Sequence, residues 1–118
     1  MGQYSGFHGD FLRGNATTMV LAILSEGPAH GYAISHEIQR RSEDLIHFKP
    51  SSLYPLLHGL ESDGFVTSDW ETSGTSRPRR IYVITPAGRE ALVARLDEYR
   101  RYDEAMAKIT WGVQHGGS

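Results

Sequence analysis

The sequence contains no cysteine, which excludes disulfide-stabilised scaffolds, thiol nucleophiles and cysteine-based zinc sites. It also lacks an excess of basic residues: 12 Lys and Arg stand against 14 Asp and Glu, so the mean charge is not that of a polybasic nucleic-acid binder. No apolar run approaches the roughly 20 residues of a membrane span, and no basic segment precedes the longest one, at residues 19–24. We therefore expect a cytoplasmic protein that does not contact membranes.

The 118 residues, of which 39% are hydrophobic and 22% charged, suit one small globular domain with at most a short extension. Residues 1–14 include four glycines, each of which costs a helix about 1 kcal/mol, so we expect a flexible arm there and order from about Asn15. The patterns described below predict a domain over residues 15–85, a long helix over 86–110 and a disordered tail over 111–118.

Two short helices are predicted at the start of this domain. The first has apolar residues at the i, i+3, i+4, i+7 and i+8 positions of one face, and they are Ala16, Met19, Val20, Ile23 and Leu24. Gly27 and Pro28 then stop this helix. A second helix, with a narrower apolar face, is predicted over about residues 29–41, with Tyr32, Ile34 and Ile38 facing inward.

A third helix has an apolar face made of Leu53, Leu56, Leu57 and Leu60. Ser52 is its favoured N-cap, because Pro55 then falls in the first turn, where its missing N–H costs nothing. Gly64 supplies a left-handed stop just after Asp63. With the leucines turned inward, the outward residues are Ser52, Tyr54, Pro55, His58, Gly59 and Ser62.

A β-hairpin and a long helix complete the chain. Residues 65–71 and 80–85 have the composition of strands and flank the polar connection 72–79. Thr85 and Pro86 then open a helix that runs to about Ile109 and would be about 36 Å long, more than the diameter of so small a domain. Part of its apolar face therefore has no partner within the chain. This face consists of Leu92, Leu96, Tyr99, Met106 and Ile109. We expect this helix to pair with the same helix of a second copy.

The predicted fold class is mostly α with a small β-hairpin (α+β). Three short helices, then a hairpin, then a long helix is the element order of a winged helix-turn-helix with a long C-terminal dimerisation helix. In that fold the third helix enters the DNA major groove and the hairpin loop contacts the backbone or minor groove. The charges agree, because no carboxylate lies between Asp44 and Glu61 and because Arg77, Arg79 and Arg80 cluster in the hairpin. The third helix exposes no Arg, Lys, Asn or Gln, so shape or water-mediated readout is expected to carry more of the specificity.

The sequence also admits functions other than DNA binding. The net charge of −2 and the base-poor third helix suit a dimeric winged-helix module that binds ligands or proteins without sequence-specific DNA binding. The third helix and hairpin could also be ordinary solvated surfaces. Enzyme activity is disfavoured, since no phosphate-binding glycine loop and no nucleophile motif is present. No metal site or cofactor is expected, because only His30 and His36 share a predicted helix, at a spacing that points them apart.

Several segments resemble the PadR family of bacterial transcriptional regulators. These are His-Gly-Tyr-Ala-Ile at 30–34, Ser-Leu-Tyr-Pro-Leu-Leu at 52–57, Leu-Glu-Ser-Asp-Gly-Phe-Val at 60–66, Arg-Pro-Arg-Arg-Ile-Tyr at 77–82 and Thr-Pro-Ala-Gly-Arg at 85–89. The resemblance runs from Met19 to Leu96 and implies a homodimeric winged-helix repressor of a palindromic operator. The chain departs from the family pattern at Ser51, where glycine is common, and at Ile81, where an aromatic residue is common.

The resemblance and the patterns above together predict two sets of functional residues. The expected DNA contacts are Tyr32, Ser51, Ser52, Tyr54, His58, Arg77, Arg79 and Arg80. The single C-terminal helix resembles the short multidrug-binding branch of the family, which implies a flat aromatic or hydrophobic effector stacked at the dimer interface against the position held here by Tyr99. The expected effector residues are Asn15, Thr18, Leu96, Tyr99, Tyr102 and Asp103. Alternatively, Tyr99 and Tyr102 only pack the dimer core.

Overall fold

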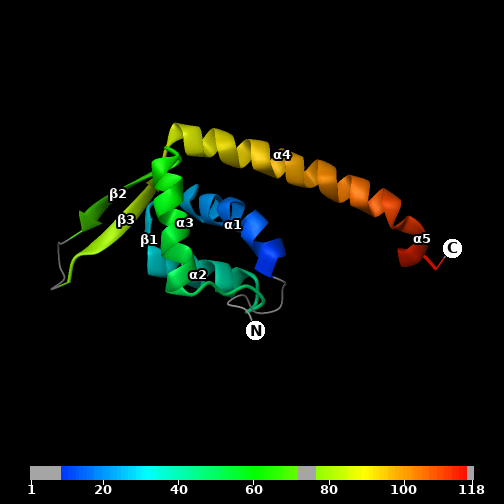
Figure 1. Cartoon of the computed structure of the whole chain (residues 1–118), viewed down its shortest axis with the longest axis horizontal. Helices are drawn as coiled ribbons and strands as arrows, with labels where there is room; N and C mark the ends of the chain where they lie inside the picture. Colours follow the sequence, from blue (N-terminus) through cyan, green and yellow to red (C-terminus); the bar gives the residue numbers. More distant parts are fainter. Residues whose placement is uncertain (1–8, 72–76, 117–118) are drawn as a thin grey trace.

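The computed structural model describes residues 9–71 and 77–116. For residues 9–13 and 114 it describes the backbone only. In chain order the elements are α1 (Gly9–Leu24), β1 (Ala29–His30), α2 (Gly31–Arg41), α3 (Pro50–Ser62), β2 (Val66–Glu71), β3 (Arg79–Ile84), α4 (Pro86–Ile109) and α5 (Trp111–Gln114). Helices α1 to α3 and the sheet form a head, α4 runs past α1 and continues beyond it, and the β2–β3 hairpin projects on the other side (Figure 1). The molecule is 62 Å along its longest axis.

The core of the head lies where α1, α2 and α3 meet the inner face of the sheet. Helices supply most of it, with Val20, Leu21 and Leu24 from α1, Ile34 and Ile38 from α2, and Leu53, Leu57 and Leu60 from α3. The sheet adds Val66, Tyr82 and Ile84, and α4 adds Leu92. Each fully buried aliphatic side chain stabilises the fold by about 1.5–3 kcal/mol. The predicted apolar faces of the first and third helices are confirmed as the faces that build this core.

The sheet has three antiparallel strands in the order β1-β3-β2, so the predicted hairpin is joined by a strand that the sequence did not indicate. Ala29 and His30 pair with β3, and α2 therefore begins at Gly31 instead of residue 29. A strand of two residues has no periodicity to detect. The inward positions of α2 are Gly31, Ile34 and Ile38; Tyr32 was predicted to face inward but is 73% exposed, because it lies about 100° round the helix from Gly31.

Two helix starts also differ from the prediction. Helix α1 begins at Gly9 instead of near Asn15, so the flexible arm is wrong for residues 9–14, while residues 1–8 lie outside the described residues. Only Gly9 and Gly14 are glycines within this stretch, and extending an existing helix through the residues between them avoids the cost of starting a new helix. Helix α3 begins at Pro50 with the extended Lys49 as its N-cap, because a residue before proline disfavours the helical region. Ser52 is therefore not the cap.

The exits from α3 and from the sheet follow the prediction. Gly64 has φ +82° and ends α3, while Thr85 caps α4 by accepting a 3.0 Å hydrogen bond from the Gly88 amide. Helix α4 reaches Ile109 as predicted. The predicted disorder from residue 111 onward is wrong for Trp111–Gln114, which form α5. The Trp111 ring stacks on His115 with centroids 3.5 Å apart, and this contact supports the extra turn.

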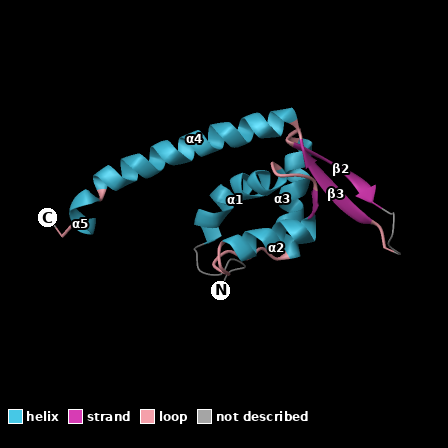
Figure 2. Cartoon of the chain, turned by 180° about the vertical axis from the view of Figure 1, so that it is seen from behind, coloured by secondary structure: helices cyan, strands magenta, loops and turns pink. Residues whose placement is uncertain are grey.

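No helix within the described residues is long and apolar enough to span a membrane. The view from behind shows the same arrangement, with the strands at one end of the molecule and the free part of α4 at the other (Figure 2). The hairpin of β2 and β3 is called the wing below, and α3 is called the recognition helix.

Candidate nucleic-acid interface and interhelical cavity

The recognition helix exposes the face that the sequence predicted. Because Leu53, Leu57 and Leu60 point into the core, Ser51, Tyr54 and His58 are exposed and Ser52 is half-buried. The helix carries one carboxylate, Glu61, in its last turn. Its leading three turns therefore present neutral hydrogen-bonding groups to solvent, and such a surface approaches a phosphate backbone without repulsion.

A cleft of about 360 Å³ separates this helix from the wing. The residues that line it are His30, Gly31, Tyr32, Tyr54, Trp70, Pro78, Arg79, Arg80 and Tyr82. Four of the eight predicted DNA contacts thus meet in one place, and they come from α2, α3 and β3. Ser51, Ser52 and His58 lie elsewhere on α3, and the exposed Arg77 precedes β3. We call this feature the wing cleft.

Gly31 lets the recognition helix come close to the start of α2. A Cβ atom at this position would lie 2.6 Å from the hydroxyl oxygen of Tyr54 and 2.7 Å from Cε1 of its ring. The Tyr54 ring therefore rests against the backbone of Gly31, at the first residue of α2. Gly31 and Trp70 were not among the predicted site residues. Trp70 is 59% exposed on β2 and pairs with Arg80 across the strands. The sequence could have indicated Trp70 only if the register of the two strands had been known.

The wing is tied to the recognition helix by a run of hydrogen bonds. Arg80 Nε donates to Ser68 Oγ over 2.9 Å, and Ser68 Oγ donates to the carboxylate of Glu61 over 2.8 Å. The Arg80 guanidinium also lies 4.8 Å from the centre of the Trp70 ring. Tyr82 is buried in the same sheet face; burial raises the pKa of its hydroxyl, and the nearby positive charge of Arg80 opposes this shift.

Polar side-chain contacts lie at both ends of α2. At its start, the ring of His30 on β1 lies with Nε2 2.7 Å from the carboxylate of Glu71 on β2. At its end, Arg40 and Arg41 donate to Glu37 and hold the pKa of that carboxyl down at about 2, mainly through the hydrogen bonds. Arg41 also donates both ends of its fork to Glu26, whose pKa is lowered. The arginine pairs are exposed and each contributes little to stability, while the contact between His30 and Glu71 is part-buried.

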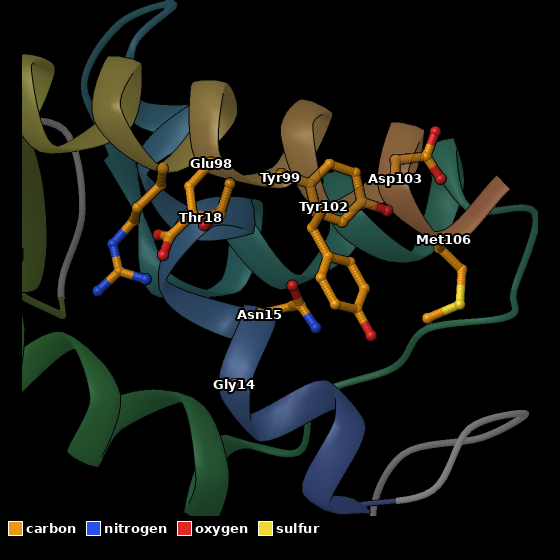
Figure 3. Close-up of a pocket in the computed structure, with 9 residues that line it drawn as sticks. Gly14, Asn15, Thr18, Glu98, Tyr99, Tyr102, Asp103 and Met106 are labelled. Atoms are coloured by element: carbon orange, nitrogen blue, oxygen red, sulfur yellow. The ribbon is translucent and has the colours of Figure 1, made fainter. Parts of the chain in front are cut away.

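A second feature, a cavity of about 460 Å³, lies between α1 and α4. Its lining consists of Gly14, Asn15 and Thr18 from α1 and Arg95, Glu98, Tyr99, Tyr102, Asp103 and Met106 from α4. Asn15 and Tyr102 point into the space between the two helices (Figure 3). The volume lies within the range of small-molecule sites. We call it the interhelical cavity.

Five of the six predicted effector residues line this cavity, and Leu96 does not. Leu96 lies with Val93 and Arg100 at a shallow pocket on another face of α4. The cavity face of α4 repeats at i, i+3, i+4, i+7, i+8 and i+11 from Arg95, and Leu96 is about 100° away from Arg95. This spacing, applied outward from Tyr99, would have found Arg95 and Met106.

The large apolar residues of α4 beyond Leu92 are exposed within the described chain. Their exposed fractions are 44% for Leu96, 56% for Tyr99, 62% for Tyr102 and 78% for Ile109. The prediction that part of this face lacks a partner within the chain is thus confirmed for the described residues. Among those residues no three His, Asp or Glu side chains are grouped as metal ligands.

Three helices around a small antiparallel sheet, an exposed third helix and a projecting hairpin define the chain as a winged helix-turn-helix protein. Residues 20–94 match the sequence profile described as "Transcriptional regulator PadR-like family". The chain belongs to this family, whose members are transcriptional regulators and not enzymes.

Individual proteins agree with this assignment. The transcriptional regulator Rv3488 of Mycobacterium tuberculosis is 31% identical over 106 residues, which cover 90% of this chain and 92% of that protein. The structure of a transcriptional regulator from Clostridium thermocellum is similar with a TM-score of 0.79 and 29% identity, over 85% of this chain and 97% of that one. Bacillus subtilis PadR in complex with operator DNA gives a TM-score of 0.63 at 27% identity, over 69% of this chain and 45% of that one.

Proposed function

We propose that two copies of the chain pair along α4 and bind a palindromic operator in double-stranded DNA, thereby repressing transcription. The observation that carries this proposal is the wing cleft, where exposed side chains of α2, α3 and the wing meet beside a recognition helix without a carboxylate in its leading turns. Bacillus subtilis PadR, with its operator complex, supports the proposal by similarity. The site of action is then the compartment that holds the DNA, which is the cytoplasm in the bacteria from which these relatives come.

In this proposal the recognition helix enters the major groove of each half-site. Ser51, Ser52, Tyr54 and His58 donate or accept hydrogen bonds at phosphates and base edges, and Tyr32 adds a further hydroxyl from α2. Because this surface has no Arg, Lys, Asn or Gln, few bidentate base contacts are available. Sequence preference then depends largely on the shape of the DNA and on bridging waters.

The wing supplies the electrostatic part of the binding. Arg77 and Arg79 are exposed next to the loop of the hairpin, and in this proposal they contact phosphates of the DNA backbone. Each phosphate contact made by a cation makes the slope of log K against log salt steeper by about one unit. The contribution of each arginine is therefore measurable by itself.

Arg79→Ala tests this role. The probe is a duplex that the wild-type protein selects from a randomised pool, and binding is measured by fluorescence anisotropy at several salt concentrations. We expect weaker binding and a salt slope reduced by about one unit for Arg79→Ala. The matched control is Arg101→Ala, which removes an exposed arginine of α4 and is expected to leave the slope unchanged. Failure of the wild type to enrich any sequence would favour a winged-helix module without specific DNA binding.

We also propose that the interhelical cavity takes a flat aromatic or hydrophobic effector that releases the DNA. Tyr99 and Tyr102 offer ring faces for stacking, and both are more than half exposed, so a second copy of α4 would close the cavity around the ligand. Two carboxylates, Glu98 and Asp103, line the cavity against one guanidinium, that of Arg95. This charge balance favours a cationic or neutral ring system over an anionic one.

A further inference from the structure

The side chain of Arg80 is held from two sides within the protein. It donates from Nε to Ser68 on β2, which in turn donates to Glu61 in the last turn of α3. On the other side its guanidinium lies 4.8 Å from the ring centre of Trp70, its direct partner across the strands. One arginine of β3 is thus connected to β2 and to the recognition helix.

The register of the wing shows in which direction Arg80 extends. Ser68 pairs with Tyr82, two positions further along β3 and away from the hairpin loop. The Arg80 side chain therefore turns back toward the base of the wing and α3, not outward toward the loop. Glu61, at the end of this run of bonds, is the one carboxylate of the recognition helix. A carboxylate here would repel DNA unless a positive charge lies close to it.

We propose that Arg80 is a positioning residue for DNA binding and not a phosphate ligand. Through Ser68 it sets the angle between the wing and the recognition helix, and its charge offsets that of Glu61. This inference rests on the DNA-binding role proposed above. The three wing arginines then have different roles, since Arg77 and Arg79 contact DNA while Arg80 holds the surface that they belong to.

The test compares variants of Arg80 and Ser68 on the duplex selected by the wild-type protein. Ser68→Ala is expected to weaken binding about tenfold, the loss of one charge-assisted hydrogen bond, with an unchanged salt slope. Arg80→Ala breaks the same connection and also leaves the charge of Glu61 without an offset, so it binds more weakly still, and the double variant binds about as weakly as Arg80→Ala alone. Arg80→Lys keeps the charge but loses the planar N–H directed at Ser68, so it binds about as weakly as Ser68→Ala.

A suppressor separates this role from a general loss of structure. Glu61→Gln removes the charge that Arg80 offsets, so Arg80→Ala with Glu61→Gln is expected to bind more tightly than Arg80→Ala alone. Thermal unfolding followed by circular dichroism checks that each variant is folded. If Arg80→Ala is not, Arg80→Lys and Ser68→Ala, which both keep the positive charge, still test the connection, because each is expected to bind about as weakly as the two combined.

Two results would overturn the inference. A salt slope that drops by about one unit in Arg80→Ala and returns in Arg80→Lys would make Arg80 a phosphate ligand like Arg79. Additive losses for Arg80→Ala and Ser68→Ala would show that the two side chains act independently. A wild-type protein that selects no DNA would instead overturn the proposed function itself, and this result is distinct from the other two.

Discussion

At the scale of single residues, two glycines hold positions where a side chain would collide. At Gly31 an added Cβ would meet the Tyr54 ring, the end of a movable side chain. At Gly88 it would collide with the carbonyl oxygen of Phe65 and would lie 2.8 Å from Cγ1 of Ile84. The Phe65 carbonyl already accepts a 3.0 Å hydrogen bond from the amide of Thr85, so it cannot withdraw without breaking that bond. Gly88 is therefore the less replaceable of the two.

Gly88→Ala is expected to lower the free energy of unfolding by about 3 kcal/mol, because the methyl group forces the backbone apart where the sheet passes into α4. Urea denaturation followed by circular dichroism measures the change. Gly59→Ala is the matched control: it lies in the exposed face of α3 with nothing within 4 Å of the added Cβ, and it should gain up to about 1 kcal/mol. Equal stability of the two variants would contradict the contact at Phe65.

The roles of single residues could be predicted from the sequence where the interacting residues lie within a few positions of each other. The stop at Gly64 and the cap at Thr85 depend on neighbours in sequence, and both are present as predicted. The collision at Gly88 depends on Phe65, which is brought near by the return of the hairpin. No pattern around Gly88 contains that information, so only the structure reveals it.

At the scale of elements, α4 has two roles along its length. Its first turns pack on the head through Leu92, and its later turns face α1 across the interhelical cavity or face solvent. A single helix thus links the DNA-binding head to the proposed effector site. Apolar periodicity was sufficient to predict α1, α3 and α4, because each has an apolar face several turns long. It missed β1 and α5, because two and four residues are too few to show a periodic apolar pattern. Leu96 was expected at the effector site but lies on another face of α4, because spacing alone does not show which side of α4 faces α1.

Tyr99→Ala tests the cavity at this scale. Proflavine, a planar cationic dye, is expected to bind the wild-type protein and to bind the variant about fivefold more weakly, since one aromatic stacking contact is worth about 1 kcal/mol. Fluorescence titration measures both affinities. Val93→Ala, which trims an exposed apolar residue outside the cavity, is the control and should leave dye binding unchanged.

The same variant distinguishes a ligand site from a packing surface. Sedimentation experiments measure how much of Tyr99→Ala is dimeric. If the variant dissociates into monomers and its remaining dimer still binds the dye with normal affinity, the two tyrosines only pack the interface. An intact dimer with weaker dye binding supports the cavity as the effector site.

At the scale of the whole molecule, one chain is only half of the proposed regulator. A palindromic operator presents two equivalent half-sites about 34 Å apart, and one recognition helix can occupy only one of them. The exposed side chains of α4, Tyr99, Tyr102 and Ile109 among them, supply the surface that a second copy would cover. The pairing of two α4 helices would then set the distance between the two recognition helices.

Light scattering at micromolar concentration is expected to give twice the chain mass of 13.2 kDa. Ile109→Asp places a carboxylate among the exposed apolar residues of α4 and should shift the particle toward the monomer, because an unpaired charge is costly to bury in an interface. A 13.2 kDa particle for the unchanged protein would rule out pairing along α4 at that concentration.

The two tryptophans of the chain stand at its opposite extremes. Trp70 lies on β2 beside Arg80, and Trp111 opens α5 beyond the end of α4 (Figure 1). With Trp111→Phe the intrinsic emission comes from the wing alone, and with Trp70→Phe it comes from the far end of the long helix alone. The protein thus carries two built-in optical reporters, one for events at the wing and one for events at the far end of α4. The two variants, each followed in time after mixing with DNA or dye, can then show which end responds first.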